Sequence, residues 1–187
     1  FLAPVKMTLQ PEIEDFHLPE SGVAHNLMIV KIRKNFPGQG MKVLSSLFGT
    51  GQMMFTKYLV AVSGDIDIRN YRELLIHIFK NTDLNKDLLF SRGPLDVLDH
   101  ASDAFSFGGK LGIDATVKMD EESLGRQENH SAGYSDIAPV LDKIFEKSII
   151  SKYNLSLLKD DIPLLILSVD RTKDADIIKK AIVLLCN

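Results

Sequence analysis

Short apolar runs alternate along the chain with segments whose apolar residues recur at helical spacing. Residues 26–32 and 58–62 combine β-branched and other apolar side chains between turn-forming residues, which predicts two strands. The second run is continuously apolar, as is typical of a strand buried on both faces of a sheet. Further strands are expected at 88–90, 111–117 and 164–169.

Helical spacing of apolar residues fills the intervals between these runs. The pattern predicts helices over 41–48, 71–80 and 136–150, and a last helix that begins near Asp174 or Asp176. Strands that alternate with such helices indicate βαβ units. The expected fold class is therefore α/β, with a mixed or mainly parallel sheet flanked by helices, a C-terminal helix and an extra β-α unit.

Composition and charge exclude several classes of protein. The 187 residues carry 22 Lys and Arg against 25 Asp and Glu, a net charge of −3, whereas nucleic-acid binders usually carry a basic stripe. With 45% hydrophobic residues the chain is too apolar for disorder, yet no apolar run reaches the roughly 18 residues of a membrane span. We therefore expect no transmembrane segment. The single cysteine, Cys186, excludes a disulfide framework, which leads us to expect a cytoplasmic protein.

The five histidines do not form a metal motif. None is paired with another at the i, i+2 or i, i+4 spacing that places two imidazoles on one metal ion. For His17, His77 and His130 we therefore expect a role in packing or solvation.

Two further motifs have both a structural and a functional interpretation. Gly49-Thr50-Gly51 follows a predicted helix rather than a strand, so we interpret it as a helix C-cap and loop rather than a phosphate loop. Asp65 and Asp67 follow a buried strand, where ligands of open α/β sheets bind. We interpret them as a turn that caps the next helix, with a metal or hydroxyl partner as the alternative.

An acidic stretch follows the third predicted strand. Asp96, Asp99 and His100 fall within five positions, after a turn at Pro94. An Asp beside a His can supply a general base, but the same carboxylates can simply cap the next turn. The sequence leaves both interpretations open.

A glycine-rich segment at 108–118 is equally distinctive. Its glycines permit close approach to another surface. Asp114 lies on an extended apolar segment and needs a partner there, because a buried unpaired carboxylate is costly. Lys110, Lys118 or a group on another chain could supply that partner.

Several of these stretches together resemble the C-terminal domain of UbiD-type decarboxylases, the family of 3-octaprenyl-4-hydroxybenzoate carboxy-lyase. The resemblance runs from about residue 2 to about 122, and its opening part, 11–19, resembles the family's linker into that domain. The stretches that carry it are His25-Asn26-Leu27, Phe36-Pro37-Gly38-Gln39, Thr56-Lys57-Tyr58, Ser63-Gly64-Asp65-Ile66-Asp67, the acidic stretch at 92–102 and Gly108-Gly109-Lys110-Leu111-Gly112-Ile113-Asp114-Ala115-Thr116. The last departs from the usual Gly-Ser-Lys-Met-Gly, and Ser63 and Gly64 stand where many relatives have Asp.

The resemblance implies a domain organisation. Residues 1–22 are expected to form a linker from a missing N-terminal region, and 23–122 the UbiD-like α/β domain. An exposed connection is expected at 123–134, and a helix plus a β-α extension at 135–187. The chain begins with Phe rather than Met, which also leads us to expect a piece of a longer protein.

The resemblance also implies an activity, the non-oxidative decarboxylation of aromatic or α,β-unsaturated acids, with 3-polyprenyl-4-hydroxybenzoate of quinone biosynthesis as one such substrate. The family uses prenylated FMN, Mn²⁺ and a monovalent cation, held by an N-terminal flavin-binding region that nothing in this sequence matches. We therefore expect no catalytic residue, no metal ligand and no bound cofactor in this fragment alone. A lipophilic quinone precursor would bring the cytoplasmic protein to a membrane.

In the family the C-terminal domain pairs subunits and closes one wall of the substrate pocket. The positions that match this wall are Phe55, Lys57, Val97, Asp99 and His100. Lys57 could meet a carboxylate or a phenolate, and Val97 could contact a ring. Exposed or core positions are the structural alternatives for both. An alternative class of function is not an enzyme part at all but a stand-alone α/β interaction domain, and a nucleotide-binding enzyme using the loop at 49–51 is a third.

Overall fold

The computed structural model describes residues 2–23, 26–125, 150–160, 162 and 164–169. The chain divides into two compact units, Phe1–Asn129 and His130–Asn187. The first unit holds the larger of the two described sheets.

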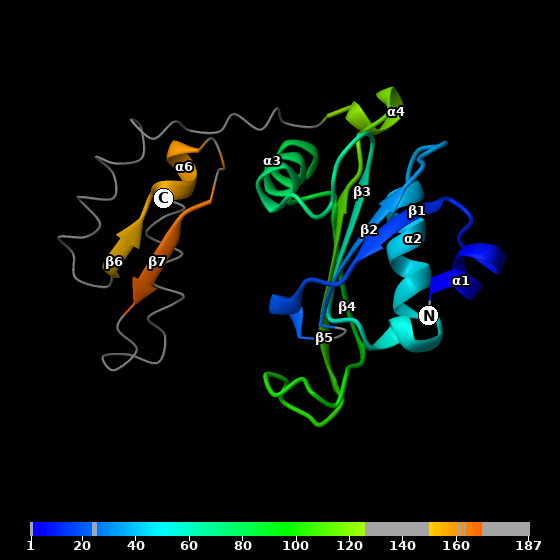
Figure 1. The fold of residues 1–187 in the computed structure, drawn as a ribbon, viewed down its shortest axis with the longest axis horizontal. Coiled ribbons are helices and arrows are strands. Elements are labelled where there is room, and N and C mark those ends of the chain that lie inside the picture. The colour runs from blue at the N-terminus through cyan, green and yellow to red at the C-terminus, as the bar shows by residue number, and fades with distance from the viewer. Residues whose placement is uncertain (1, 24–25, 126–149, 161, 163, 170–187) are drawn as a thin grey trace. The chain divides into compact units, whose positions relative to one another are not determined.

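The first unit is built on a mixed five-stranded sheet of order β1-β2-β3-β5-β4 (Figure 1). Its strands are β1 (Ile13–His17), β2 (Leu27–Ile32), β3 (Tyr58–Ser63), β4 (Leu88–Pro94) and β5 (Phe107–Ala115). The three central strands, β2, β3 and β5, are parallel, and the two edge strands pair with them antiparallel. The prediction of a mixed sheet flanked by helices is confirmed.

Two helices cover opposite faces of this sheet, as Figure 1 shows. Helix α2 (Gln39–Phe48) packs through Val43, Leu44 and Leu47 on one set of alternating strand residues. Helix α3 (Tyr71–Asn81) packs through Leu74 and Ile78 on the other set. Because side chains alternate across a strand, β2 and β3 are buried on both faces, as their continuous apolar runs predict.

Burial on the α3 face differs between the two ends of the sheet. Val60, Val62 and Ala115, toward the carboxyl ends of β3 and β5, are buried in the cluster that includes α3. In the first row, at the amino ends, Tyr58 is 45% exposed. This difference between the two ends of the sheet determines where a site can form.

The N-terminal segment belongs to the first unit. Residues expected to be a linker contain α1 (Leu2–Thr8) and β1, and β1 pairs with β2 at the edge of the sheet. Neither was predicted from the sequence, and for β1 the reason is that its two apolar residues, Ile13 and Phe16, are three positions apart and so lack the period of two of a strand. The short helices of this unit are η1 (Glu20–Gly22), η2 (Gly51–Phe55) and α4 (Asp120–Ser123).

The second unit contains a two-stranded antiparallel sheet of β6 (Ile150–Asn154) and β7 (Ile166–Val169), with the short helix α6 (Ser156–Lys159) between them. The strand expected at 164–169 is thus confirmed, whereas β6 was not predicted. The helix expected at 136–150, apart from Ile150, which begins β6, and the helix expected near the C-terminus lie outside the described residues, as do His25, His130 and Cys186. None of the helices in the described part of the chain has the length and apolar character that a membrane span requires.

Candidate functional site

A long loop joins β4 to β5 at the amino ends of the parallel strands. Residues 95–106 form this loop, which we call the 95–106 loop. Leu95, the first residue of the loop, is fully buried. Its backbone amide donates to the carbonyl of Ser106, the last residue of the loop. Ser106 has a left-handed backbone with φ of 54°, which is unusual for a residue other than glycine. The loop is therefore closed at its base, with its tip projecting from the sheet (Figure 1).

An ion pair fixes the middle of this loop to the sheet. Nζ of Lys57, just before β3, lies 2.8 Å and 3.1 Å from the two carboxylate oxygens of Asp99. The same carboxylate accepts hydrogen bonds from the Ser102 hydroxyl and, at 3.0 Å, from the Ala101 amide. The Lys57 ammonium first, and then these two donors, lower the pKa of the Asp99 carboxyl to about 2. The structure thus brings together two of the residues predicted from the sequence.

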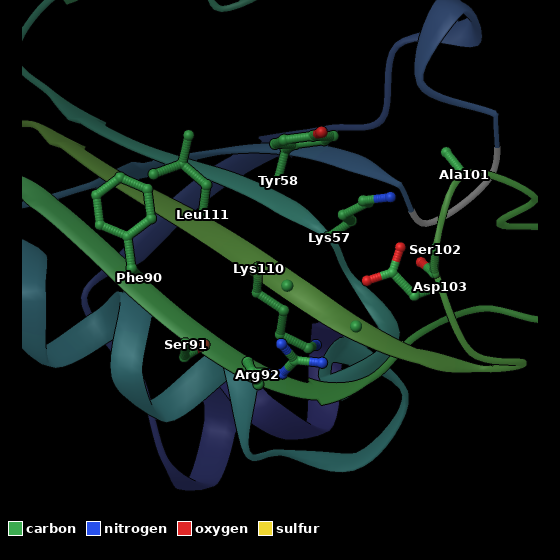
Figure 2. A pocket seen from close by; sticks show the side chains of 12 residues that line it. Lys57, Tyr58, Phe90, Ser91, Arg92, Ala101, Ser102, Asp103, Lys110 and Leu111 are labelled. Carbon is green, nitrogen blue, oxygen red and sulfur yellow. The ribbon is translucent and has the colours of Figure 1, made fainter. Parts of the chain in front are cut away.

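An open depression of about 460 Å³ lies beside this ion pair (Figure 2). Its floor is a row of apolar side chains, since Tyr58 pairs with Leu111 and Leu111 with Phe90 across three adjacent strands. Tyr58 is 45% exposed and Phe90 is 73% exposed. An apolar row this accessible on a sheet that is otherwise covered is typical of a binding surface.

Two basic residues flank the floor on β4 and β5. Arg92 is exposed on β4, with its guanidinium carbon 5.4 Å from the centre of the Phe107 ring. Lys110 is buried, and its Nζ donates to the carbonyls of Met54 and, at 2.9 Å, Thr56. Burial lowers the pKa of the Lys110 ammonium to about 8.

The other residues predicted for the pocket wall lie around this depression without lining it. Phe55 is half-buried at the end of η2, two residues before Lys57. Val97 is 60% exposed and His100 is also exposed, both on the 95–106 loop. An apolar contact from Val97 to a ring stays a prediction, as does any role of His100.

The opposite end of the sheet carries a second, more highly charged depression of about 580 Å³, lined by both acidic and basic side chains. Beneath it, Nζ of Lys118 lies 3.2 Å from carboxylate oxygens of both Asp87 and Asp114. Lys118, not Lys110, is thus the partner that the Asp114 carboxylate requires. A Cβ on Gly40 would overlap the Asp114 carboxylate, so glycine is needed for this close packing.

The remaining motifs have structural roles. Gly49 is the C-cap of α2, as predicted. The Asp67 carboxylate accepts the Arg69 amide at 2.9 Å, and the Asn70 side chain caps α3. His77 is half-buried, with Nε2 3.0 Å from the Ala115 carbonyl oxygen, and burial lowers the pKa of its imidazole.

The described residues do not form a metal centre. Within 2–23, 26–125 and the described part of the second unit, no three His, Cys, Asp or Glu side chains come close enough to hold a metal ion. The lining of the depression instead combines apolar side chains with Lys57, Arg92 and Lys110 against the single carboxylate of Asp103, which suits an apolar or anionic group better than a metal ion.

Sequence reasoning missed most of the lining residues. The sequence assigned no site role to Tyr58, Phe90, Arg92 or Leu111, and these residues come together only once the strands are paired. The one available signal is that Phe90 and Arg92 alternate on one strand, which places them on the same face.

Comparison with known sequences gives a consistent family. The sequence model of the 3-octaprenyl-4-hydroxybenzoate carboxy-lyase C-terminal domain matches residues 1–115. An uncharacterized protein of Aquifex aeolicus is 42% identical over 127 residues, which are 68% of this chain and 26% of that protein. An uncharacterized protein of Archaeoglobus fulgidus is 38% identical over 125 residues, which are 66% and 26% of the two chains. The chain thus spans about a quarter of the length of the curated relatives it matches.

Solved structures share the fold. The closed form of vanillic acid decarboxylase from Sedimentibacter hydroxybenzoicus superposes with a TM-score of 0.58 and 20% identity, covering 76% of this chain and 30% of that one. The UbiD-class enzyme HmfF from Pelotomaculum thermopropionicum, in complex with FMN, gives a TM-score of 0.56 and 21% identity, covering 70% and 29%. At these identities the likeness establishes the fold alone.

Proposed function

The chain belongs to the family of the 3-octaprenyl-4-hydroxybenzoate carboxy-lyase C-terminal domain, and on this basis we propose that it closes the substrate pocket of a UbiD-class decarboxylase. The substrates are aromatic or α,β-unsaturated acids, with a polyprenylated hydroxybenzoate of quinone biosynthesis among them. The reaction is the release of CO₂ without net oxidation. This proposal concerns the whole protein, of which the chain supplies one wall.

The observation that carries the proposal is the ion pair between Lys57 and Asp99. It holds the 95–106 loop beside an open depression with an apolar floor. A pocket wall needs these two properties, a fixed loop and an accessible apolar surface that a flat ring can contact. The side chains of Lys57 and Asp99 are 13% and 4% exposed, so water screens their interaction only partly.

The cofactors that the family implies do not fit the described residues. No metal-ligating cluster occurs among them, and the depression offers Arg92 but no carboxylate triad or cluster of imidazoles. We assign prenylated FMN, Mn²⁺ and the monovalent cation to an N-terminal region of the same protein, as the family resemblance implies. The chain's own contribution is to bind and enclose the substrate.

The exposed apolar row also supports a role in assembly. Phe90 lies on β4, an edge strand of the sheet, where exposed apolar side chains favour association with another surface. We include pairing of subunits in the proposed function, as the family resemblance implies.

Kinetics of the full-length protein test the proposal. With prenylated FMN and Mn²⁺ supplied, we expect decarboxylation of an aromatic acid, and Asp99→Ala should raise KM at least about tenfold by releasing the loop. Asp96→Ala is the matched control, because its carboxylate lies on the same loop but caps a turn at the Leu98 amide. Equal KM values for the two variants would remove the pocket role. An inactive full-length protein that still self-associates would favour a stand-alone interaction domain.

A further inference from the structure

The positive charge of Lys57 is already compensated within the chain. Both oxygens of Asp99 lie within 3.1 Å of its Nζ. An anionic ligand would have to compete with this carboxylate, which the Ser102 hydroxyl and the Ala101 amide hold in place. The family resemblance suggests Lys57 as the partner of an anionic ligand. Its bonds to both oxygens of Asp99 make Lys57 a poor anion partner.

Arg92 differs from Lys57 in this respect. Its guanidinium contacts the face of the Phe107 ring and, within the described residues, has no carboxylate partner. The cation faces the depression from β4, across from the 95–106 loop (Figure 2). A guanidinium presents paired N–H donors that match the two oxygens of a carboxylate.

The space beside Arg92 is left open by a glycine. Arg92 pairs with Gly109 in the β4–β5 ladder, and a Cβ on Gly109 would meet no atom within 4 Å. The apolar floor at Tyr58 and Leu111 begins one row further along the same strands. A flat group placed on this floor therefore brings a substituent over Gly109, within reach of the guanidinium.

The acidic groups lie at the other end of the depression. Asp103 follows Ser102 on the 95–106 loop, and Figure 2 shows both on the side of Lys57. Because the charges of Lys57 and Asp99 compensate each other, the charge is polarised between the Asp103 carboxylate at the loop and the Arg92 guanidinium on β4. A ligand with one anionic end has one favourable orientation.

From this arrangement we infer that Arg92 is the specificity-determining residue of the depression, and that it binds the carboxylate of a ligand whose flat apolar part lies on Tyr58 and Leu111. Lys57 is a positioning residue that holds the loop. This role of Arg92 extends the proposed function and depends on it in one respect, namely that the substrate binds at this depression.

NMR titration of the full 187-residue chain tests the inference. Benzoate is the anionic probe and benzyl alcohol is the uncharged probe with the same ring. We expect benzoate to shift the amide signals of residues 90–92 and 108–111, and Arg92→Gln to weaken its binding at least about tenfold. Binding of benzyl alcohol should change less than about twofold. Absence of benzoate binding to the wild-type chain, or binding that Arg92→Gln does not weaken, would overturn the inference.

Three control variants test whether the anion binds at Arg92 rather than at another cation of the chain. Arg33→Gln removes the same charge from an exposed residue at the opposite depression and should leave benzoate affinity within about twofold. The double variant Lys57→Gln/Asp99→Asn removes both charges of the ion pair and releases the loop, so it should weaken benzoate and benzyl alcohol by the same factor. If the double variant weakens benzoate alone and by as much as Arg92→Gln does, the anion site lies at Lys57 and the inference is contradicted. Gly109→Leu fills the open space and should weaken both probes.

The same variants distinguish this inference from the proposed function. An active full-length enzyme whose Arg92→Gln variant keeps the wild-type KM overturns the inference and leaves the proposed function standing. An inactive full-length protein whose benzoate binding depends on Arg92 supports the inference and removes the proposed function.

Discussion

The two ends of the central sheet differ in how their charged side chains are paired and buried. At the carboxyl ends of the parallel strands, Lys118 is enclosed with Asp87 and Asp114, and all three side chains are at most 8% exposed. At the amino ends, Lys57 and Asp99 form a pair at the edge of an open depression, where Arg92 has no carboxylate partner among the described residues. We call these the closed end and the open end.

This difference separates structural charge from charge that can act on a ligand. At the closed end the buried carboxylates are paired with the Lys118 ammonium, and the Asp114 carboxylate is also packed against Gly40. At the open end Tyr58 and Phe90 are exposed beside an arginine, on the face of the sheet opposite α2. In many open α/β sheets the ligand site is at the carboxyl ends of the strands, and the site proposed for this domain lies at the opposite end.

The largest effect on stability is expected from Lys118→Met at the closed end. It would leave two carboxylates buried without their cation, which costs about 3–5 kcal/mol of unfolding free energy. Urea denaturation measures this loss. Lys86→Met is the control, since exposed Lys86 also bonds backbone carbonyls, and it should cost less than about 1 kcal/mol. Similar losses for the two variants would erase the distinction between the ends.

Two glycine substitutions compare the ends directly. Gly40→Ala should destabilise the protein by about 2–4 kcal/mol, because its Cβ would overlap the buried Asp114 carboxylate. Gly109→Ala at the open end meets no atom and should change stability by less than about 0.5 kcal/mol. Thermal and urea unfolding of both variants test this. A large loss for Gly109→Ala would show that the open end is packed in solution.

The free energy of unfolding is expected to depend on pH in the alkaline range because of Lys110. Its ammonium has a pKa of about 8 in the folded chain, below the ordinary value of 10.5, so the unfolded chain binds more protons between these values. The free energy of unfolding should therefore rise by about 1–2 kcal/mol from pH 8 to pH 10.5. Urea titrations at several pH values should show this rise in the wild type and a smaller one in Lys110→Met. Identical slopes would mean that Lys110 is hydrated.

Asp99 gives a smaller effect at acidic pH. The pKa of its carboxyl in the folded chain, about 2, lies below the ordinary 3.8, so the stabilisation is complete above about pH 4 and is lost as the pH falls toward 2. Because the pair lies at a partly solvated edge, we expect about 1 kcal/mol. Asp99→Asn should flatten this part of the stability profile, and Asp96→Asn should not. A profile that Asp99→Asn leaves unchanged would contradict the ion pair.

Local pattern was sufficient for the elements that form the core. The continuous apolar run at 58–62 and the helical spacing at 41–48 and 71–80 identify β3, α2 and α3 within a few residues. Strand β1 could not be identified in this way, because its strand character comes from pairing with β2.

The candidate site depended on the resemblance for Lys57 and Asp99, which lie 42 residues apart and carry no local motif. The rest of the depression arises from strand register, since Tyr58, Leu111 and Phe90 become neighbours only through β-pairing. Choosing between Lys110 and Lys118 as the partner of Asp114 likewise required the fold, in which the Lys110 ammonium donates to the Met54 and Thr56 carbonyls and Lys118, beyond the end of β5, turns back to Asp114. Single-sequence patterns carry no information on either point.

Amide hydrogen exchange of the full-length protein, with and without a bound aromatic acid, tests most directly whether the open end is the ligand site. If the open end closes on substrate, the ligand should slow exchange of residues 99–103 and 107–111, whereas residues 63–65 and 117–119 at the closed end should not change. Protection that appears only at the closed end, or at neither end while the ligand is bound, would contradict this assignment.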